Sequence, residues 1–125
     1  MSGFESKRKM RSETGTIKVV INADYGGFSL SGEAYAVIAK VNGWTRCTND
    51  YGQDYLLDDK GNKLFYWNIP RDNLGLVTAV ETLGSEDAGG EHSTLKIVEV
   101  PDSVNWYVEE YDGKEWVAER HRTWD

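Results

Sequence analysis

The sequence is poor in the residues that build cross-links and metal sites. It contains one cysteine, Cys47, and two histidines, His92 and His121, among 125 residues. A single thiol cannot form an intramolecular disulfide, and the set is too small for the usual cysteine-rich zinc site. The sequence therefore predicts no metal and no cofactor, and it favours a reducing compartment.

Long hydrophobic runs are also missing. The longest apolar stretches, at 18–21 and 35–39, fall far short of the ~20 residues that a membrane-spanning helix requires. The charged beginning of the chain lacks the apolar segment of a secretion signal. We therefore expect a cytoplasmic protein with no membrane partner.

No arrangement of residues points strongly to catalysis. The carboxylate pairs Asp58-Asp59 and Glu109-Glu110 either lie in a turn or alternate across a strand, so neither pair converges on one substrate atom. His121 has arginine neighbours but no identifiable nucleophile to activate. The expectation is a protein that is not an enzyme.

Acidic residues outnumber basic ones, and they do so unevenly along the chain. The totals are 21 Asp and Glu against 14 Lys and Arg, a formal charge of −7. Residues 1–14 carry four bases and two acids, so the remainder carries −9. Such a charge repels free nucleic acid and attracts basic surfaces. We predict a disordered basic leader at 1–14 and a single acidic domain at 15–125.

The pattern of strands and helices predicts an α+β fold. Expected strands are 16–22, 55–57, 63–67, 94–100, 105–111 and 114–121, and expected helices are 32–41 and 74–83. Asp112-Gly113 is the strongest hairpin signal, because both residues tolerate positive φ in a type I′ turn. Residues 85–91 are expected to be an exposed loop. The order β-α-β-β-α-β-β-β predicts a two-layer sandwich of a mostly antiparallel sheet and two helices.

One candidate binding site is the turn Tyr25-Gly26-Gly27-Phe28, between the first strand and the first helix. Free backbone N–H groups at such a turn can hold an anion such as phosphate. The turn lacks the third glycine of a dinucleotide loop and the Gly-Lys-Ser/Thr of a P-loop. The alternative is a structural role, in which the glycines permit a tight turn and the aromatic residues pack.

A second candidate site is the basic cluster near the C-terminus, Arg120, His121 and Arg122, with Trp124. Arginine binds phosphate bidentately and tryptophan stacks on bases, which suits a nucleotide. We assign these residues, Arg71 and the glycine turn to one candidate nucleotide site. The alternative is that the arginines pair with nearby acids.

Acids are dense in the last third of the chain: Glu99, Asp102, Glu109, Glu110, Asp112, Glu115 and Glu119. If several share one face at strand spacing, they would imitate a nucleic-acid backbone and bind a basic groove on another protein. Ordinary solvated edge strands are the alternative. Aromatic residues make up 12% of the chain, more than a small core needs, so some should line a binding surface.

Three stretches carry a resemblance to a known group. They are VVINADYGGFSLSGEA at 19–34, NIPRD at 68–72, and LKIVEVPD with EEYDGKEWVAERHRTW beyond 94. On these motifs the chain resembles small uncharacterised proteins encoded by tailed bacteriophages, over about residues 16–124. The resemblance supplies no functional residue. It implies accessory work in the cytoplasm of an infected bacterium, including interference with host defence.

The expected function is therefore that of a non-enzymatic phage-type accessory protein that binds and inhibits a host macromolecule. Its partner would be a host protein with a basic surface, such as a CRISPR effector, and homo-oligomer formation is left open. One alternative is a sponge that sequesters a phosphate-bearing nucleotide signal of host defence. Another is a minor virion or assembly protein.

Overall fold

A computed structural model of the chain describes residues 15–120. The predicted leader and three of the candidate site residues, His121, Arg122 and Trp124, lie outside the described residues. The elements in chain order are β1 Thr16–Asn22, α2 Gly32–Asn42, β2 Thr45–Thr48, β3 Asp54–Leu57, β4 Lys63–Leu64, the 3₁₀ turn η1 Tyr66–Asn68, α3 Leu74–Leu83, α4 Ser85–Ala88, β5 Leu95–Pro101, β6 Trp106–Tyr111 and β7 Lys114–Glu119.

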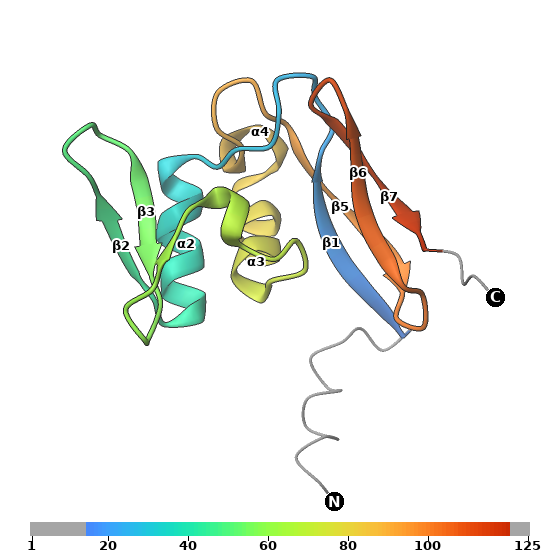
Figure 1. Cartoon of the computed structure of the whole chain (residues 1–125), viewed down its shortest axis with the longest axis horizontal. Helices are drawn as coiled ribbons and strands as arrows, with labels where there is room; N and C mark the ends of the chain where they lie inside the picture. The colour runs from blue at the N-terminus through green and yellow to red at the C-terminus, as the bar shows by residue number, and fades with distance from the viewer. Residues whose placement is uncertain (1–14, 121–125) are drawn as a thin grey trace, which may run out of the picture.

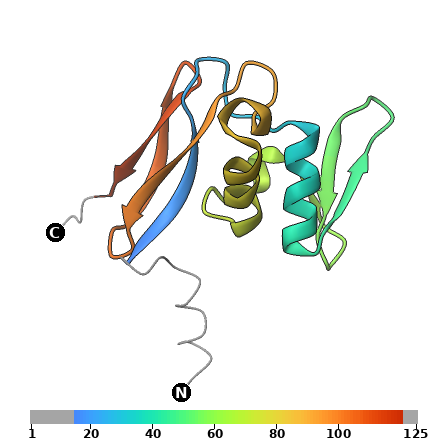
Figure 2. The ribbon, with the colours of Figure 1, turned by 180° about the vertical axis from the view of Figure 1, so that it is seen from behind.

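These elements form successive layers (Figures 1 and 2). The sheet β2-β3-β4 packs on α2, and α3 separates α2 from the pair β1-β5. The hairpin β6-β7 then covers the far face of β1-β5. The α+β class and the antiparallel pairing are confirmed. The structure differs in dividing the strands among three small sheets, with the helices between two of them.

The two longer helices match the predicted ranges 32–41 and 74–83 to within one residue. The side chains of Ser31 and Asn73 each accept a hydrogen bond from the first turn of α2 and α3, a contact that contributes about 1 kcal/mol. Gly43 and Gly84, both at positive φ, follow the last residues of the two helices. Within 15–120, no helix is long and apolar enough to cross a membrane.

The β6-β7 hairpin is confirmed, together with its turn. Asp112 and Gly113 have φ values of 53° and 91°, and Tyr111 pairs with Lys114 across them. Two successive positive φ values define the type I′ turn, whose twist matches that of the flanking strands.

The segment predicted as an exposed loop at 85–91 differs in the structure. Its first half forms α4, and Ala88 is fully buried. The Ser31 N–H donates to the Ala88 carbonyl (3.0 Å), so α4 closes the beginning of α2. Ala88 is the only apolar side chain of the segment, so its polar composition gave no helical pattern. Residues 45–48, which gave no clear prediction, form β2.

Strand β1 is buried on both faces, as its apolar run predicts. Val20 faces the helices, whereas Val19 and Ile21 face the β6-β7 hairpin and pack with Val100 of β5. Burying each of these side chains contributes about 2 kcal/mol. The strand therefore forms the wall between two hydrophobic clusters.

Tyr35 on α2 tests the packing of the hydrophobic cluster between the helices and β1, to which it belongs. Burial raises the pKa of its phenol to about 12, against a smaller opposing effect of a hydrogen bond with the Tyr66 backbone. Because the folded state favours the neutral phenol, the stabilisation is complete below the unfolded value of about 10 and is lost as the pH rises towards 12. Absorbance at 295 nm should show a tyrosine titrating near pH 12, and Tyr35→Phe should remove that step. Titration of every tyrosine near pH 10 in the folded protein would contradict the packing.

Candidate functional site

Asn22, the last residue of β1, joins three neighbouring segments through its side chain. It is 0% exposed. Its Nδ2 donates to the carbonyls of Asp24 (2.7 Å) and Gly113 (2.8 Å), and its Oδ1 accepts from the Thr94 N–H (3.0 Å). The buried amide is thus fully bonded. It holds the glycine turn against the β6-β7 turn.

The glycines of this junction are needed for close approach of backbones. A Cβ on Gly26 would collide with the carbonyl of His92, and a Cβ on Gly113 would collide with the carbonyl of Tyr25 and the amide of Gly27. Gly27 also has a φ of 90°, a value at which glycine is favoured. The glycine contacts and the packing of Phe28 agree with the structural alternative for the turn, whereas Tyr25 is 60% exposed and does not pack as that alternative expects.

The glycine turn and the N-terminus of α2 do not form one anion-binding loop. Ser31, which precedes α2, lies four residues after Gly27. Its hydroxyl donates to the Asp87 carbonyl (2.6 Å), and its amide donates to the Ala88 carbonyl (3.0 Å). The residue that precedes the helix is therefore bonded to α4 and is not directed at a ligand.

Arg71 and Glu115, which the sequence assigns to two different sites, form one ion pair. Nη1 donates to Oε1 (2.5 Å) and Nη2 to Oε2 (2.8 Å), the bidentate arrangement of strong carboxylate pairs. The side chains are only 21% and 7% exposed. The guanidinium also lies over the Phe28 ring, 3.6 Å from its centroid. Arg71 is thus committed to protein contacts and not to a phosphate.

The same pair closes the edge of β1. The Val20 N–H donates to the Arg71 carbonyl (2.8 Å), and Arg71 Nη1 donates to the Val20 carbonyl (3.3 Å). The Asn22 N–H donates to Glu115 Oε1 (2.8 Å). These outward-pointing groups would otherwise be available to a further strand. The ion pair therefore blocks strand addition at this end of β1.

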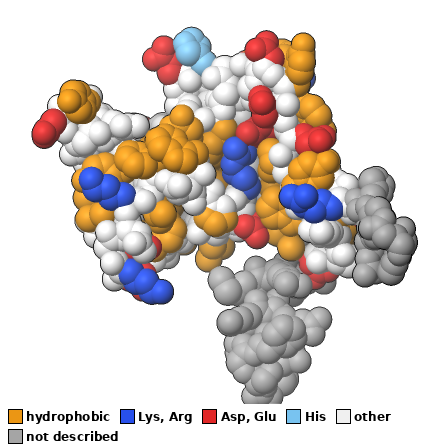
Figure 3. All heavy atoms as spheres, viewed as in Figure 1, with side chains coloured by type: hydrophobic (Ala, Val, Ile, Leu, Met, Phe, Trp, Pro, Cys, Tyr) orange, Lys and Arg blue, Asp and Glu red, His pale blue; other side chains and the backbone are white. Residues whose placement is uncertain are grey.

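Aromatic side chains form a continuous band from β3 to the turn after β1. Phe65 stacks on Trp67 with 4.7 Å between ring centroids, and contacts of 4.8–6.2 Å extend the band through Tyr55, Tyr66 and Phe28. Figure 3 shows hydrophobic side chains gathered on this face over β3 and η1. Trp67 is 58% exposed. Part of the aromatic excess therefore lies at the surface, and that this surface binds a partner stays a prediction.

Arg120 lies at the other end of the hairpin from the glycine turn. Gly113 contacts that turn, and the intervening β7 has six residues, a span of about 20 Å. Arg120 instead lies over the Tyr107 ring, 4.6 Å from its centroid. Among the described residues, the structure does not bring Arg120 to Gly27. The glycine turn and Arg120 therefore do not form one nucleotide site.

The acids of the hairpin lie on two faces. Glu109 is on the outer face, where its carboxylate accepts from the Tyr107 hydroxyl (3.0 Å) and Trp116 Nε1 (3.1 Å). The bond to Glu109 raises the pKa of the Tyr107 phenol. Glu115 and Glu119 share the opposite face, since residues two apart in a strand point the same way.

The remaining acids do not complete a row either. Glu110 accepts from the Gly113 N–H (2.9 Å), and Asp112 lies in the turn. Asp102 follows β5, and its N–H donates to the Gly15 carbonyl (2.8 Å). The described acids therefore do not present the regular spacing of nucleic-acid phosphates.

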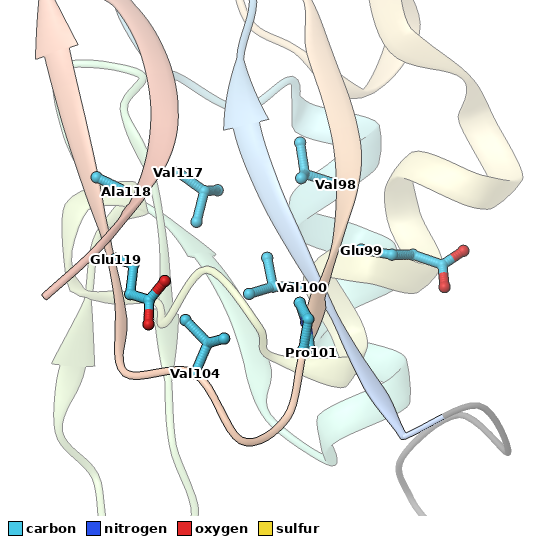
Figure 4. Close-up of a pocket in the computed structure, with 8 residues that line it drawn as sticks. All are labelled: Val98, Glu99, Val100, Pro101, Val104, Val117, Ala118 and Glu119. Carbon is cyan, nitrogen blue, oxygen red and sulfur yellow. The ribbon is translucent and has the colours of Figure 1, made fainter.

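An apolar groove of about 300 Å³ opens between β5 and β7 (Figure 4). Its lining residues are Val98, Glu99, Val100, Pro101, Val104, Val117, Ala118 and Glu119. Val98 and Val100 point from β5 towards Val117 on β7, and the Glu119 carboxylate lies beside Val104. The Glu99 side chain points away from the groove and accepts from the Thr16 hydroxyl (2.9 Å).

Glu119 gives this groove its charge. The side chain belongs to an exposed residue at the end of β7, and within 15–120 its carboxylate forms no hydrogen bond or ion pair. Ionised carboxylates at the edge of an apolar surface attract cations that carry apolar stems, such as lysine and arginine. The groove therefore suits a segment that presents apolar and basic side chains together.

Sequence reasoning missed the valine walls of the groove, the role of Asn22 and the Arg71–Glu115 pair. One signal was present, because strand alternation places Glu115 on the same face as Val117 and so predicts a buried acid. The groove has no local signal, since it depends on how two ribbons pack. Among the described residues, no group of three or more His, Cys, Asp or Glu could hold a metal ion.

Comparison with known proteins adds no relative. No protein-family model, no curated protein and no solved structure matches the chain.

Proposed function

We propose that the protein is a non-catalytic binding protein whose β5-β7 groove receives a segment of a host protein with adjoining apolar and basic side chains. The observation that carries this proposal is the valine-lined groove with the Glu119 carboxylate beside it, which has no partner among residues 15–120. The net charge of −7 supports it, because an acidic surface accelerates encounter with basic partners.

The biological setting of the proposal rests on the resemblance to tailed-phage proteins. In that setting the partner is a nucleic-acid-binding protein of the bacterium, such as a defence effector, and stoichiometric binding inhibits it. The nucleotide-sponge alternative lacks comparable support, since Arg71 is paired with Glu115 and the Gly26 region is packed against His92.

The groove is expected to be one anchor of a larger interface. Burying one valine- or leucine-sized side chain contributes about 2 kcal/mol, and an exposed ion pair contributes up to about 1 kcal/mol. Together these are too small for a stable protein complex. A short peptide should therefore bind weakly but measurably.

A peptide of alternating lysine and valine tests the groove on the full chain. Glu119→Gln should weaken binding about fivefold at low salt, because it removes the carboxylate from the groove. Glu99→Gln should leave binding unchanged, because this side chain points away although its backbone lines the same groove. Because these contributions correspond to millimolar or weaker affinity, chemical-shift titration of the ¹⁵N-labelled chain measures both.

The apolar wall has its own control. Val98→Thr preserves the shape of the side chain and adds a hydroxyl to the groove, so it should weaken binding of the peptide. Val41→Thr, on the exposed face of α2, should leave binding unchanged. Equal affinities for all four variants, or equal binding of a glutamate-valine peptide, would exclude the groove as the site.

A further inference from the structure

The β6-β7 hairpin leaves one edge of β6 unpaired. The Arg120 N–H donates to the Asn105 carbonyl (2.7 Å), so these two facing residues form a hydrogen-bonded pair. Hydrogen-bonded and non-hydrogen-bonded pairs alternate along an antiparallel ladder, so the next pair, Trp106 and Glu119, is not hydrogen-bonded. By the same alternation, Trp106, Val108 and Glu110 direct their backbone groups away from β7. No backbone hydrogen bond joins these three outward groups to another described segment.

Other strand edges carry features that discourage pairing. The Arg71–Glu115 pair closes one end of β1. The outer edge of β5 ends at Pro101 and the strand carries an exposed Lys96, while β2 has four residues, including Arg46. Proline, short length and basic side chains are recognised ways of blunting an edge. Strand β6, with six residues, contains no proline, glycine or lysine, and its charged residues are Glu109 and Glu110 near its end.

The outer face of the hairpin is rich in exposed aromatic residues. Tyr111 is 74% exposed and Trp116 is 44% exposed. Tyr107 lies on the same face, because it alternates with Tyr111 along β6 and Trp116 faces Glu109, the residue between them in that alternation. This face and the free β6 edge adjoin each other. A partner that extends the sheet at β6 would also enlarge the aromatic face.

We propose that two copies of this chain pair antiparallel through their β6 edges, about a twofold axis at Val108. In that register Tyr107 faces Glu109 of the second copy, and Trp106 faces Glu110. No two carboxylates are opposite each other. An axis at Glu109 would instead place two glutamates directly opposite, which is destabilising. The charge pattern of β6 therefore disfavours axes at Glu109 and Glu110, and the Val108 axis pairs more of the strand than an axis at Tyr107 or Trp106 that is shifted towards its beginning.

This dimer goes beyond the proposed binding function and has a geometric consequence. The twofold axis of an antiparallel edge pairing runs perpendicular to the sheet, so the four strands β7-β6-β6-β7 share their outer face. The two β5-β7 grooves then lie on the opposite side and face the same direction. Two grooves on one particle increase avidity for a partner with repeated basic segments.

Native mass spectrometry and light scattering of the full chain test the dimer. We expect a species with twice the mass of one chain. Tyr107→Glu places a carboxylate opposite Glu109 twice in each dimer and should weaken dimerisation about tenfold or more, whereas Tyr107→Lys should preserve it. Both variants lose the same tyrosine contacts with Glu109 and Arg120. Because the new charge also acts on Glu109 and Arg120 of its own chain, circular dichroism must show both variants folded before their dimerisation is compared.

A second pair of variants tests the backbone edge. Glu110→Pro removes an outward N–H from β6, whereas Glu99→Pro removes an outward N–H from β5. Only the first should give a monomer, with circular dichroism confirming that both variants fold. A monomeric parent chain at about 100 μM, where weak dimers are populated, overturns the proposal. Equal dimerisation of Tyr107→Glu and Tyr107→Lys also overturns it, as does loss of the dimer in Glu99→Pro alone.

Discussion

Replacing Glu115 with alanine should lower the free energy of unfolding by about 3 kcal/mol, the largest effect expected for any acid of the hairpin. The substitution leaves the Arg71 guanidinium, which is only 21% exposed, without its carboxylate. It also removes the acceptor of the Asn22 N–H. Urea unfolding followed by tryptophan fluorescence measures the loss as a lower midpoint at unchanged slope.

Two controls separate this effect from a general sensitivity of β7. Glu119→Ala, on the same face of the strand but without a partner among the described residues, should change stability by less than about 0.5 kcal/mol. Arg71→Met combined with Glu115→Leu should recover much of the loss, because no unpaired charge remains. If Glu115→Ala and Glu119→Ala are equally stable, the Arg71–Glu115 ion pair does not stabilise the fold as proposed.

Asn22→Ala is expected to destabilise the protein by a similar amount, about 3 kcal/mol. It leaves the partly buried Thr94 N–H without its acceptor and the carbonyls of Asp24 and Gly113 without their donor. Asn105→Ala is the matched control, since Asn105 is exposed and only its backbone is seen to bond. The same urea titration compares them, and a difference below about 1 kcal/mol would contradict the role of Asn22.

Local chemistry predicted the elements whose signals are local. The predicted helices 32–41 and 74–83 match α2 and α3 to within one residue, and Asp112-Gly113 marks the hairpin, because caps and turns depend on a few neighbouring residues. The apolar run at 19–21 predicted a strand covered on both faces. Helix α4 was missed because its polar sequence gives no amphipathic pattern, and its place depends on the burial of one alanine.

The candidate site was less predictable, because its contacts join residues far apart in sequence. Arg71 and Glu115 are separated by 44 positions, and no local pattern assigns an arginine to a particular acid. The density of acids along the chain suggested one acidic face, whereas strand alternation places Glu109 on the opposite face from Glu115 and Glu119. The groove arises from the packing of one two-stranded ribbon on another, which neither ribbon encodes alone.

The two proposals can fail separately. The β5-β7 groove depends on the inner face of the hairpin, and the dimer depends on the edge and outer face of β6. A monomer that binds the lysine-valine peptide keeps the groove and removes the dimer. A dimer that ignores the peptide does the reverse.

The most direct test of the groove is an amide map of the full chain by nuclear magnetic resonance. The ¹⁵N-labelled protein is titrated with the lysine-valine peptide, and shifts are assigned by residue. We predict that the largest shifts fall within 98–104 and 117–119, and that 25–28 do not change. Shifts centred on the glycine turn or on the aromatic band around Trp67, or no shifts at all, would contradict the proposed function.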